Sequence, residues 1–402
     1  MANDYREKRM DFTLDEKTNA QVLKLRHFIK TELQPLEDEV ELRGALDSDL
    51  AREIFEKSRT QGFYGMNIPA EFGGGGFNAI QMVYLEQEMG QTTDPLVRRA
   101  FGNVYEVLLA CNEAQRQQWL LPCVKGERTC SIAMTEPEAG SDSAAITATA
   151  RPDGDGWILN AHKCPVGDGM FSDFYVVSAR SEDVEGSRGI SLFLVDRSMP
   201  GVEVVRDMPM MGLRGSTHVE IKFDNVKLGP EHLLGERGRG LSLLLSTIGR
   251  IRLFHIGARA IGMGRRVLKM MTDRANQREQ FGKPIGEFQM IQQMLADSLI
   301  ELNCAHLLVL DAASEIDRGL DPREKVSMVK INSAETLGKI ADRAVQLFGA
   351  MGYCKDFPLE RIYRDCRVLR IYDGTSEIHR MVVSRGLMKK GVDAILGNHL
   401  AN

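Results

Sequence analysis

His218-Val-Glu-Ile-Lys-Phe-Asp224 is the stretch of this 402-residue chain that decides its fold class. Val219, Ile221 and Phe223 alternate with polar residues, so their side chains would share one face of an extended strand. This period of two is typical of a half-buried antiparallel strand. Because the sequence on either side has mainly helical patterns, the stretch predicts a β domain set between helical parts.

Other short runs between residues 130 and 224 have the same strand character. They are rich in β-branched and aromatic residues and are separated by Gly, Pro and Asp, which favour turns. The clearest of them are Trp157–Leu159, Phe174–Ala179, Ile190–Val195 and Val202–Val205. Such a series predicts a small barrel or sandwich, and we expect it to occupy residues 128–237.

The flanking parts have the period of a helix. Before the β region, apolar residues recur every three or four positions, as at Val22, Leu25, Phe28, Ile29 and Leu33. After residue 240, long helical patterns joined by short turns are typical of an up-and-down bundle. We therefore expect a mainly α protein with an N-terminal helical domain at 1–127, a central small β-barrel domain and a C-terminal four-helix bundle at 238–402.

The composition excludes several classes of protein. Hydrophobic residues make up 43% of the chain and charged residues 27%, as in soluble globular proteins. A net charge of −5 provides no basic surface for nucleic acid. No apolar run approaches the length of a membrane span, and residues 1–9 lack a signal-peptide core. The seven cysteines and eight histidines show no metal-ligand spacing, so we expect free thiols, a cytoplasmic protein and no metal.

The segment Ile371-Tyr-Asp-Gly-Thr-Ser-Glu-Ile-His-Arg380 carries the clearest candidate for chemistry. Asp373 lies beside a glycine, which lets the backbone approach a ligand, and just before an apolar helical pattern. A carboxylate among polar donors suits a general base. The structural interpretation is that Asp373 is a helix N-cap, because Asp is preferred there and most Asp-Gly turns are only turns. Glu377, one helical turn later, is expected to interact with the helix dipole.

Three segments resemble signatures of the acyl-CoA dehydrogenase family. Thr135–Asp142 is similar to its T-E-P-x-A-G-S-D, Arg278–Ile285 to its R-x-x-F-G-x-x-I, and Tyr372–Thr375 to the turn that carries its catalytic Glu. The resemblance covers nearly the whole chain, because the family has the same order of helical, β and helical domains. It implies FAD as the cofactor and Asp373, one methylene shorter than Glu, as the base.

The resemblance also implies roles for individual residues. Met134 and Thr135 would face the flavin, and Ser141 would meet the CoA-thioester side chain. Gly374 is expected at the substrate, and the hydroxyl groups of Thr375 and Ser376 at the flavin. Further contacts with FAD, in part that of a neighbouring subunit, are expected from Arg278, Phe281, Phe288, Gln289, Gln346 and Gly349.

Three further positions depart from the family pattern. The usual segment is Gly-x-Lys-x-Trp-Ile-Thr, in which the Trp packs on the flavin and the Thr hydroxyl lies near its reactive N5. Pro165 stands at the Trp position and Gly167 at the Thr position. Both are still expected to border the flavin, and Gly167 offers a backbone N–H. Ala350 replaces the second glycine of the family's Q-x-x-G-G-x-G.

The function that the resemblance implies is α,β-dehydrogenation of an acyl-CoA thioester. Asp373 would remove the α-proton while the β-hydrogen leaves as hydride to flavin N5. An electron-transfer flavoprotein would accept the electrons, and the protein would be a homotetramer. Two alternatives stay open: a catalytically quiet member that acts as a binding or assembly subunit, and a flavin oxidase of the nitroalkane-oxidase type, which also uses an Asp base.

Overall fold

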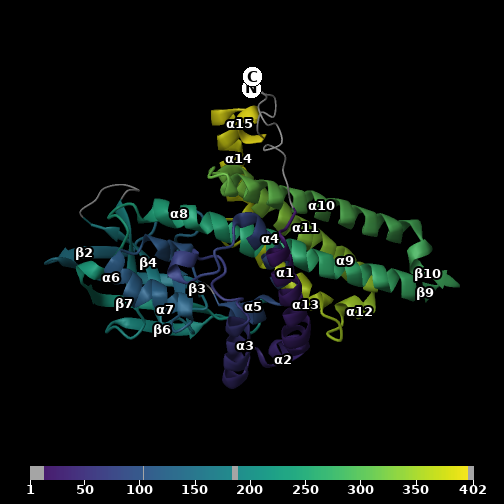
Figure 1. Cartoon of the computed structure of the whole chain (residues 1–402), viewed down its shortest axis with the longest axis horizontal. Coiled ribbons are helices and arrows are strands. Elements are labelled where there is room, and N and C mark those ends of the chain that lie inside the picture. Colours follow the sequence, from purple (N-terminus) through teal and green to yellow (C-terminus); the bar gives the residue numbers. More distant parts are fainter. Residues whose placement is uncertain (1–12, 103, 183–188, 397–402) are drawn as a thin grey trace. The chain divides into compact units, whose positions relative to one another are not determined.

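The structure is a computed structural model that describes residues 13–102, 104–182 and 189–396. Residues 1–9, in which no signal-peptide core is expected, lie outside the described residues. The chain divides into two compact units, which we call the helical unit and the β unit (Figure 1). The helical unit comprises Met1–Pro35, Asn78–Thr92 and Gly249–Asn402, and the β unit comprises Leu36–Phe77 and Thr93–Ile248.

The β unit is built on one eight-stranded sheet. Its strands are β1 (Cys130–Ala133), β2 (Thr149–Asp153), β3 (Gly156–Gly167), β4 (Phe174–Ser181), β5 (Ile190–Asp196), β6 (Val202–Asp207), β7 (His218–Leu228) and β8 (Leu233–Leu234). The order across the sheet is β6-β7-β3-β2-β4-β5-β8, and β1 pairs with β4. The pairs that β4 makes with β1 and β2 are parallel, and the others are antiparallel.

Strand β7 has the alternating burial that its sequence predicts. Val219, Ile221 and Phe223 are buried in the core of the β unit, whereas Lys222 and Asp224 are exposed. The expected closed barrel is wrong, because the edge strands β6 and β8 do not pair with each other in the described sheet. Periodicity identifies strands, but closure depends on their tilt and register, which a local pattern does not contain.

The β unit also contains helices. They are α2 (Glu37–Arg43), α3 (Ser48–Thr60), α5 (Asp94–Phe101), α6 (Glu113–Gln115), α7 (Leu121–Lys125) and the greater part of α8 (Gly240–Ile251). Helix α5 carries Arg98 and Arg99, which contact the residue that follows β3. It begins after Thr93 with a proline in its first turn, where the missing N–H of proline costs no hydrogen bond, and it ends at Gly102, whose φ is 59°.

The helical unit contains the long helices expected in the C-terminal part. Its elements are α1 (Glu16–Phe28), α4 (Ala79–Met89), the π-helical segment η9 (Arg252–Ala258), α9 (Arg259–Gln277), α10 (Gln289–Asp317), α11 (Arg323–Phe348), α12 (Ala350–Tyr353), α13 (Leu359–Cys366), α14 (Ser376–Lys390) and α15 (Val392–Leu396). Helix α11 packs against α9, α10, α13 and α14, and Figure 1 shows it running beside α10. Its buried apolar residues recur at helical spacing and include Val326, Val329, Leu337, Ile340 and Ala344.

Helix α4 comes from the N-terminal part of the sequence but packs with α9 and α10 in the helical unit. Gly262 permits its close approach to α9, since a Cβ there would lie 1.9 Å from the Gln87 carbonyl oxygen. Below 3 Å the backbones would have to separate. The N-terminal and C-terminal parts of the sequence therefore share one core in this unit.

One helical run among the described residues, Gly240–Gln277, is long and apolar enough to cross a membrane by length and composition alone. A helix in the core of a soluble protein passes the same test. Of the apolar 18-residue window within this run, 44% is buried. The seven cysteines are all free thiols.

Candidate active site

The turn before α14 holds the candidate base by its main chain. Asp373 has a φ of 54°, in the left-handed region that Asp adopts more readily than most residues. Its carbonyl oxygen accepts hydrogen bonds from Arg252 Nε at 2.7 Å and from His379 Nε2 at 3.1 Å. Donors from η9 and from α14 therefore fix the backbone from which the half-buried Asp373 side chain projects.

Gly374 provides the space for one of these donors. Its φ is 94°, and a Cβ at this position would lie 2.9 Å from His379 Nε2. Burial and the nearby Arg252 charge lower the pKa of His379 to about 4, so the imidazole is neutral near pH ~7. Because Nε2 faces a carbonyl oxygen, we assign the hydrogen to Nε2, which leaves Nδ1 as an acceptor.

The N-cap interpretation of Asp373 is wrong, because Thr375 caps α14. The Thr375 hydroxyl oxygen accepts the Ile378 amide at 3.2 Å. Glu377 lies in the first turn of the helix, as the dipole argument predicts. Ser376 is 1% exposed, and its hydroxyl has no hydrogen-bond partner within the described residues.

Two cations interact electrostatically with Asp373 inside the helical unit. They are Arg252 and Lys330 of α11. Burial lowers the pKa of Lys330 to about 8, and the Asp373 charge opposes that decrease. Burial also lowers the pKa of Arg252, again opposed by Asp373. Both cations therefore attract the Asp373 carboxylate.

In the β unit, a buried ion pair anchors the segment that resembles the first signature. Lys163 is 0% exposed, and its ammonium donates to Glu136 at 2.8 Å. Glu136 also accepts the amides of Thr147 at 2.6 Å and Ala148 at 3.0 Å. One carboxylate therefore joins β3 to both ends of the loop between β1 and β2. Burial lowers the pKa of Lys163 to about 8, against the effect of Glu136.

The same anchor places the predicted flavin-facing residues of the β unit together. Lys163 donates to the Met134 carbonyl at 3.0 Å, and the Cys164 amide donates to the Thr135 carbonyl at 2.9 Å. Met134 and Thr135 consequently lie beside the part of β3 that carries Pro165 and Gly167. Ser141, farther along the loop, is exposed and lies in a bend.

A group of charged residues surrounds Asp168, which directly follows β3. Asp168 is 9% exposed and accepts Arg98 Nη1 at 2.9 Å and Arg99 Nη2 at 2.6 Å. Arg98 also pairs with Asp94 at the start of α5. A Cβ on Gly167 would lie 3.8 Å from Arg98 Nη1. The guanidinium therefore lies next to the position where the family has a threonine side chain.

Several buried polar atoms around this group have no hydrogen-bond partner in the described ranges. They are Thr93 Oγ1, Arg99 Nε, Ser216 Oγ, Thr217 Oγ1 and His218 Nδ1. Buried polar groups without partners cost free energy and commonly mark a place for a bound molecule. Hydroxyl, imidazole and guanidinium groups match the carbonyl oxygens and ring nitrogens of a flavin, so the residues present fit FAD.

The predicted contacts with a neighbour's FAD lie on the helical unit and are mostly exposed. Phe288 is half-buried, whereas the others are exposed: Arg278, Phe281, Gln289, Gln346 and Gly349. Phe281 is 94% exposed, and its ring forms an edge-to-face pair with that of Phe288, with centroids 6.1 Å apart. Arg274 lies over the Phe348 ring at 5.4 Å and so connects the end of α9 with the end of α11.

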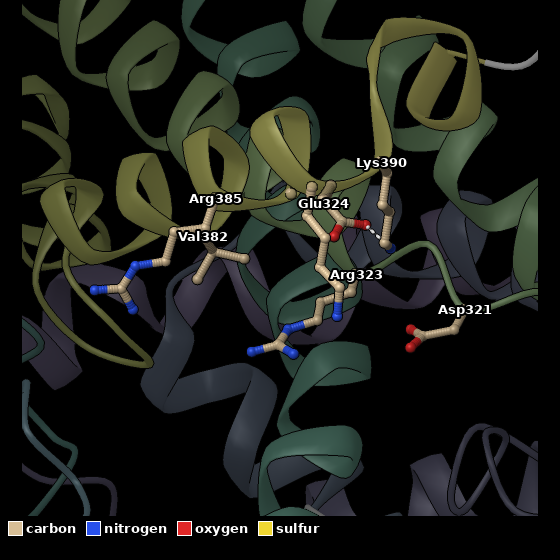
Figure 2. A pocket seen from close by; sticks show the side chains of 8 residues that line it. Asp321, Arg323, Glu324, Val382, Arg385 and Lys390 are labelled. Atoms are coloured by element: carbon tan, nitrogen blue, oxygen red, sulfur yellow. Dashed lines mark hydrogen bonds and ion pairs between the residues drawn. The ribbon is translucent and has the colours of Figure 1, made fainter.

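A basic pocket of about 280 Å³ lies between the start of α11 and the end of α14 (Figure 2). It is lined by Asp321, Arg323, Glu324, Val382, Arg385, Gly386, Lys389 and Lys390. Lys390 is paired with Glu324 at 2.8 Å. The four cations outnumber the two carboxylates, so the pocket favours an anion. Besides burial, the charge of Arg323 also lowers the pKa of Arg252, whose Nε binds the Asp373 carbonyl. The charges of the pocket therefore act on the turn at Asp373.

Several residues that hold the two candidate segments, the Asp373 turn in the helical unit and the end of β3 in the β unit, were not predicted from the sequence. Arg252 is 121 positions from the Asp373 carbonyl that it binds, and His379, which also binds it, stands in the quoted segment but was assigned no role. Arg98 and Arg99 carried a usable signal, because two arginines stand inside the apolar run Leu96-Val-Arg-Arg-Ala-Phe101. Arginines on a buried helix face require partner carboxylates, which points to a charged site.

Family models match almost the whole chain. The N-terminal, middle and C-terminal domain models of acyl-CoA dehydrogenase match residues 15–127, 131–226 and 238–388. These ranges have the same order as the predicted domains.

Individual relatives agree with the family models. The chain is 35% identical over 372 residues to the 3-(aryl)acrylate reductase of Clostridium sporogenes, covering 90% of this chain and 96% of the relative. It is 35% identical over 384 residues to the caffeyl-CoA reductase-Etf complex subunit CarC of Acetobacterium woodii, covering 92% and 98%. The structure of butyryl-CoA dehydrogenase from Megasphaera elsdenii superimposes with a TM-score of 0.87 at 27% identity, covering 94% and 100%.

Proposed function

The chain belongs to the acyl-CoA dehydrogenase family, and from this premise we propose that Asp373 is the catalytic base of an FAD-dependent acyl-CoA oxidoreductase. The observation that carries the assignment is the geometry of the turn before α14 that contains Asp373 and Gly374, which we call the base turn. Arg252 and His379 hold the Asp373 carbonyl, while Thr375 provides the helix cap. The Asp373 carboxylate therefore has no capping role to explain its presence.

The reaction proposed is α,β-desaturation of an acyl-CoA thioester. The Asp373 carboxylate takes the α-proton, and the electron pair of that C–H bond forms the new double bond as the β-hydrogen leaves with its own pair. FAD, when bound, supplies the acceptor for that hydride. Met134, Thr135, Pro165, Gly167 and the unpartnered hydroxyls nearby would hold the flavin ring, together with Thr375 and Ser376.

The basic pocket supports a CoA ester as the substrate. CoA carries phosphate groups, which bind to Arg and Lys side chains. The pocket volume of about 280 Å³ suits only one end of so large a ligand. We propose that Arg323, Arg385 and Lys389 bind phosphate groups there, while Ser141 and Gly374 contact the thioester part.

A second candidate is the same chemistry in the reverse direction. The relatives named above are a 3-(aryl)acrylate reductase and a subunit of a caffeyl-CoA reductase-Etf complex. In the reductive direction Asp373 would carry the proton and donate it to the α-carbon. An electron-transfer flavoprotein would be the redox partner in both directions. The exposed Phe281 and Arg278 support a homo-oligomer, which we propose is a tetramer, and the free cysteines support a cytoplasmic location.

The decisive experiment is anaerobic titration of the FAD-loaded protein with paired saturated and 2,3-unsaturated acyl-CoAs. We expect bleaching of the flavin by a saturated ester, or reoxidation of the reduced flavin by its unsaturated partner. The variant Asp373→Asn should retain FAD and bind the ligand, but lose this reaction because an amide does not accept the proton. A protein that takes up no flavin would favour the quiet-subunit alternative. Hydrogen peroxide release with a nitroalkane would favour the oxidase.

Wild-type turnover by Asp373→Asn on the best substrate would remove Asp373 as the base. Because Thr375 provides the cap, the substitution removes no capping hydrogen bond, so the variant should remain folded and lost activity could not be attributed to unfolding.

A further inference from the structure

Helix α11 contains two buried lysines with opposite surroundings. Lys325 is 4% exposed, and its Nζ lies 2.7 Å from Asp311 and 2.6 Å from Glu315. Lys330 is 0% exposed, and its Nζ has no hydrogen-bond partner in the part of the chain that the structure describes. A buried ammonium without a partner destabilises the folded protein, so its presence calls for a reason outside stability.

Helix α11, which carries Lys330, packs against η9 and α14, and charged groups from four elements act on this lysine. Asp373 of the base turn has the strongest electrostatic interaction with it. Arg252 of η9 repels it, and Glu377 of α14 and Glu335 of α11 attract it more weakly. Among these charged groups, the strongest partner of Lys330 is therefore Asp373, the carboxylate that we propose as the catalytic base.

The two glutamates have other roles. Glu335 pairs with Arg370 at 3.0 Å and lies 3.8 Å from Arg380. Glu377 is exposed in the first turn of α14, where the helix dipole stabilises an acid. His379 is neutral and donates to the Asp373 carbonyl, so it contributes no charge. Asp373 is therefore the carboxylate on which the Lys330 charge acts most directly.

We propose that Lys330 is a positioning residue of the catalytic base: its buried charge keeps the Asp373 carboxylate ionised and oriented in the strained turn. The proposal rests on the proposed function, in which Asp373 moves the substrate proton. Unlike an exposed ion pair, this charge is weakly screened by salt.

The pH profile of the flavin half-reaction tests the functional part of the proposal. Lys330→Met removes the charge at similar length, Lys330→Arg retains it, and Lys339→Met makes the same chemical change on α11 at a half-exposed residue paired with Glu301. Without the cation Asp373 should hold its proton to higher pH, so the acid limb of Lys330→Met should move up by about 1 pH unit. Lys330→Arg should restore most of that shift, and Lys339→Met should leave the limb in place.

A double-mutant cycle on stability tests the physical link without using activity. Denaturant midpoints are measured for wild type, Lys330→Met, Asp373→Asn and the double variant at neutral pH. Asp373→Asn should lower the midpoint when Lys330 is present, because it removes the carboxylate that attracts the buried ammonium. It should have almost no effect in the Lys330→Met background.

The outcomes separate the two proposals. The role of Lys330 would be overturned if the effects of the two substitutions on the denaturant midpoint simply added. It would also be overturned if the acid limb of the pH profile did not move in a folded Lys330→Met protein. Both conclusions hold even if Asp373→Asn abolishes the reaction. Retained turnover in Asp373→Asn would instead refute the proposed function, and with it the catalytic meaning of any coupling.

Discussion

The substitution Gly374→Ala tests whether the base turn depends on the close approach of His379. A Cβ at residue 374 would meet His379 Nε2 at 2.9 Å, and φ is 94°. Left-handed backbone costs an L-residue about 1–2 kcal/mol, and loss of the hydrogen bond from His379 to the Asp373 carbonyl costs about 1 kcal/mol more. We therefore expect the free energy of unfolding to fall by about 2–3 kcal/mol.

The matched control is Gly44→Ala at the end of α2. Gly44 has a φ of 70° and a ψ of 14°, in the left-handed region, and the nearest atom to a Cβ there would be Arg214 Nη2 at 3.9 Å, an ordinary contact distance. It shares the backbone strain and lacks the contact, so it should cost only about 1–2 kcal/mol. The difference between the two variants, about 1 kcal/mol, then measures the contact with His379.

The assay combines denaturant unfolding with anaerobic flavin bleaching. Displacement of His379 releases one of the two donors on the Asp373 carbonyl, and misplacement of a base on the order of 1 Å costs about a hundredfold in rate. We expect Gly374→Ala to slow bleaching roughly 10–100-fold while Gly44→Ala keeps the wild-type rate. Equal unfolding costs together with an unchanged bleaching rate in Gly374→Ala would refute the argument that this glycine positions the base.

The other predictions concern the flavin, the oligomer and pH. Pro165→Trp with Gly167→Thr should alter the spectrum of bound FAD and its bleaching rate, because it restores the family residues expected to border the flavin, and a Cβ at residue 167 would lie 3.8 Å from Arg98 Nη1; an unchanged spectrum in a folded protein would show that these residues do not touch the ring. Arg278→Ala should weaken FAD retention and loosen the oligomer, and gel filtration showing a monomer that keeps one FAD per chain would contradict this. Lys330 has a lowered folded-state pKa of about 8, so the unfolded chain binds the proton more tightly and wild-type stability should rise between pH ~8 and ~10.5, by up to about 3 kcal/mol. Lys330→Met should be the more stable protein at pH ~7 and lose that advantage above pH ~10 in denaturant titrations.

Local patterns in the sequence were sufficient for the class of the fold and for the family. The alternation at Val219, Ile221 and Phe223 predicted a half-buried strand, and the structure confirms it. The family named from the three signatures is also confirmed, because the matching models cover each part of the chain. Such features depend on residues close together in the sequence, which is the range that periodicity and motifs report.

The tertiary structure decided what depends on residues far apart in the sequence. The sheet is open because β6 and β8 do not meet, which strand patterns do not reveal. The helix cap belongs to Thr375 instead of Asp373, a choice between neighbouring side chains that only the backbone angles resolve.

The electrostatic setting of Asp373 was beyond the sequence for the same reason. Arg252 is 121 positions from Asp373 along the chain, and Lys330 lies on another helix. Charges act through space, and their strength depends on burial, which packing alone determines. The sequence determined that a carboxylate stands at the start of the last long helix; the packing of η9, α11 and α14 decided which charges surround it.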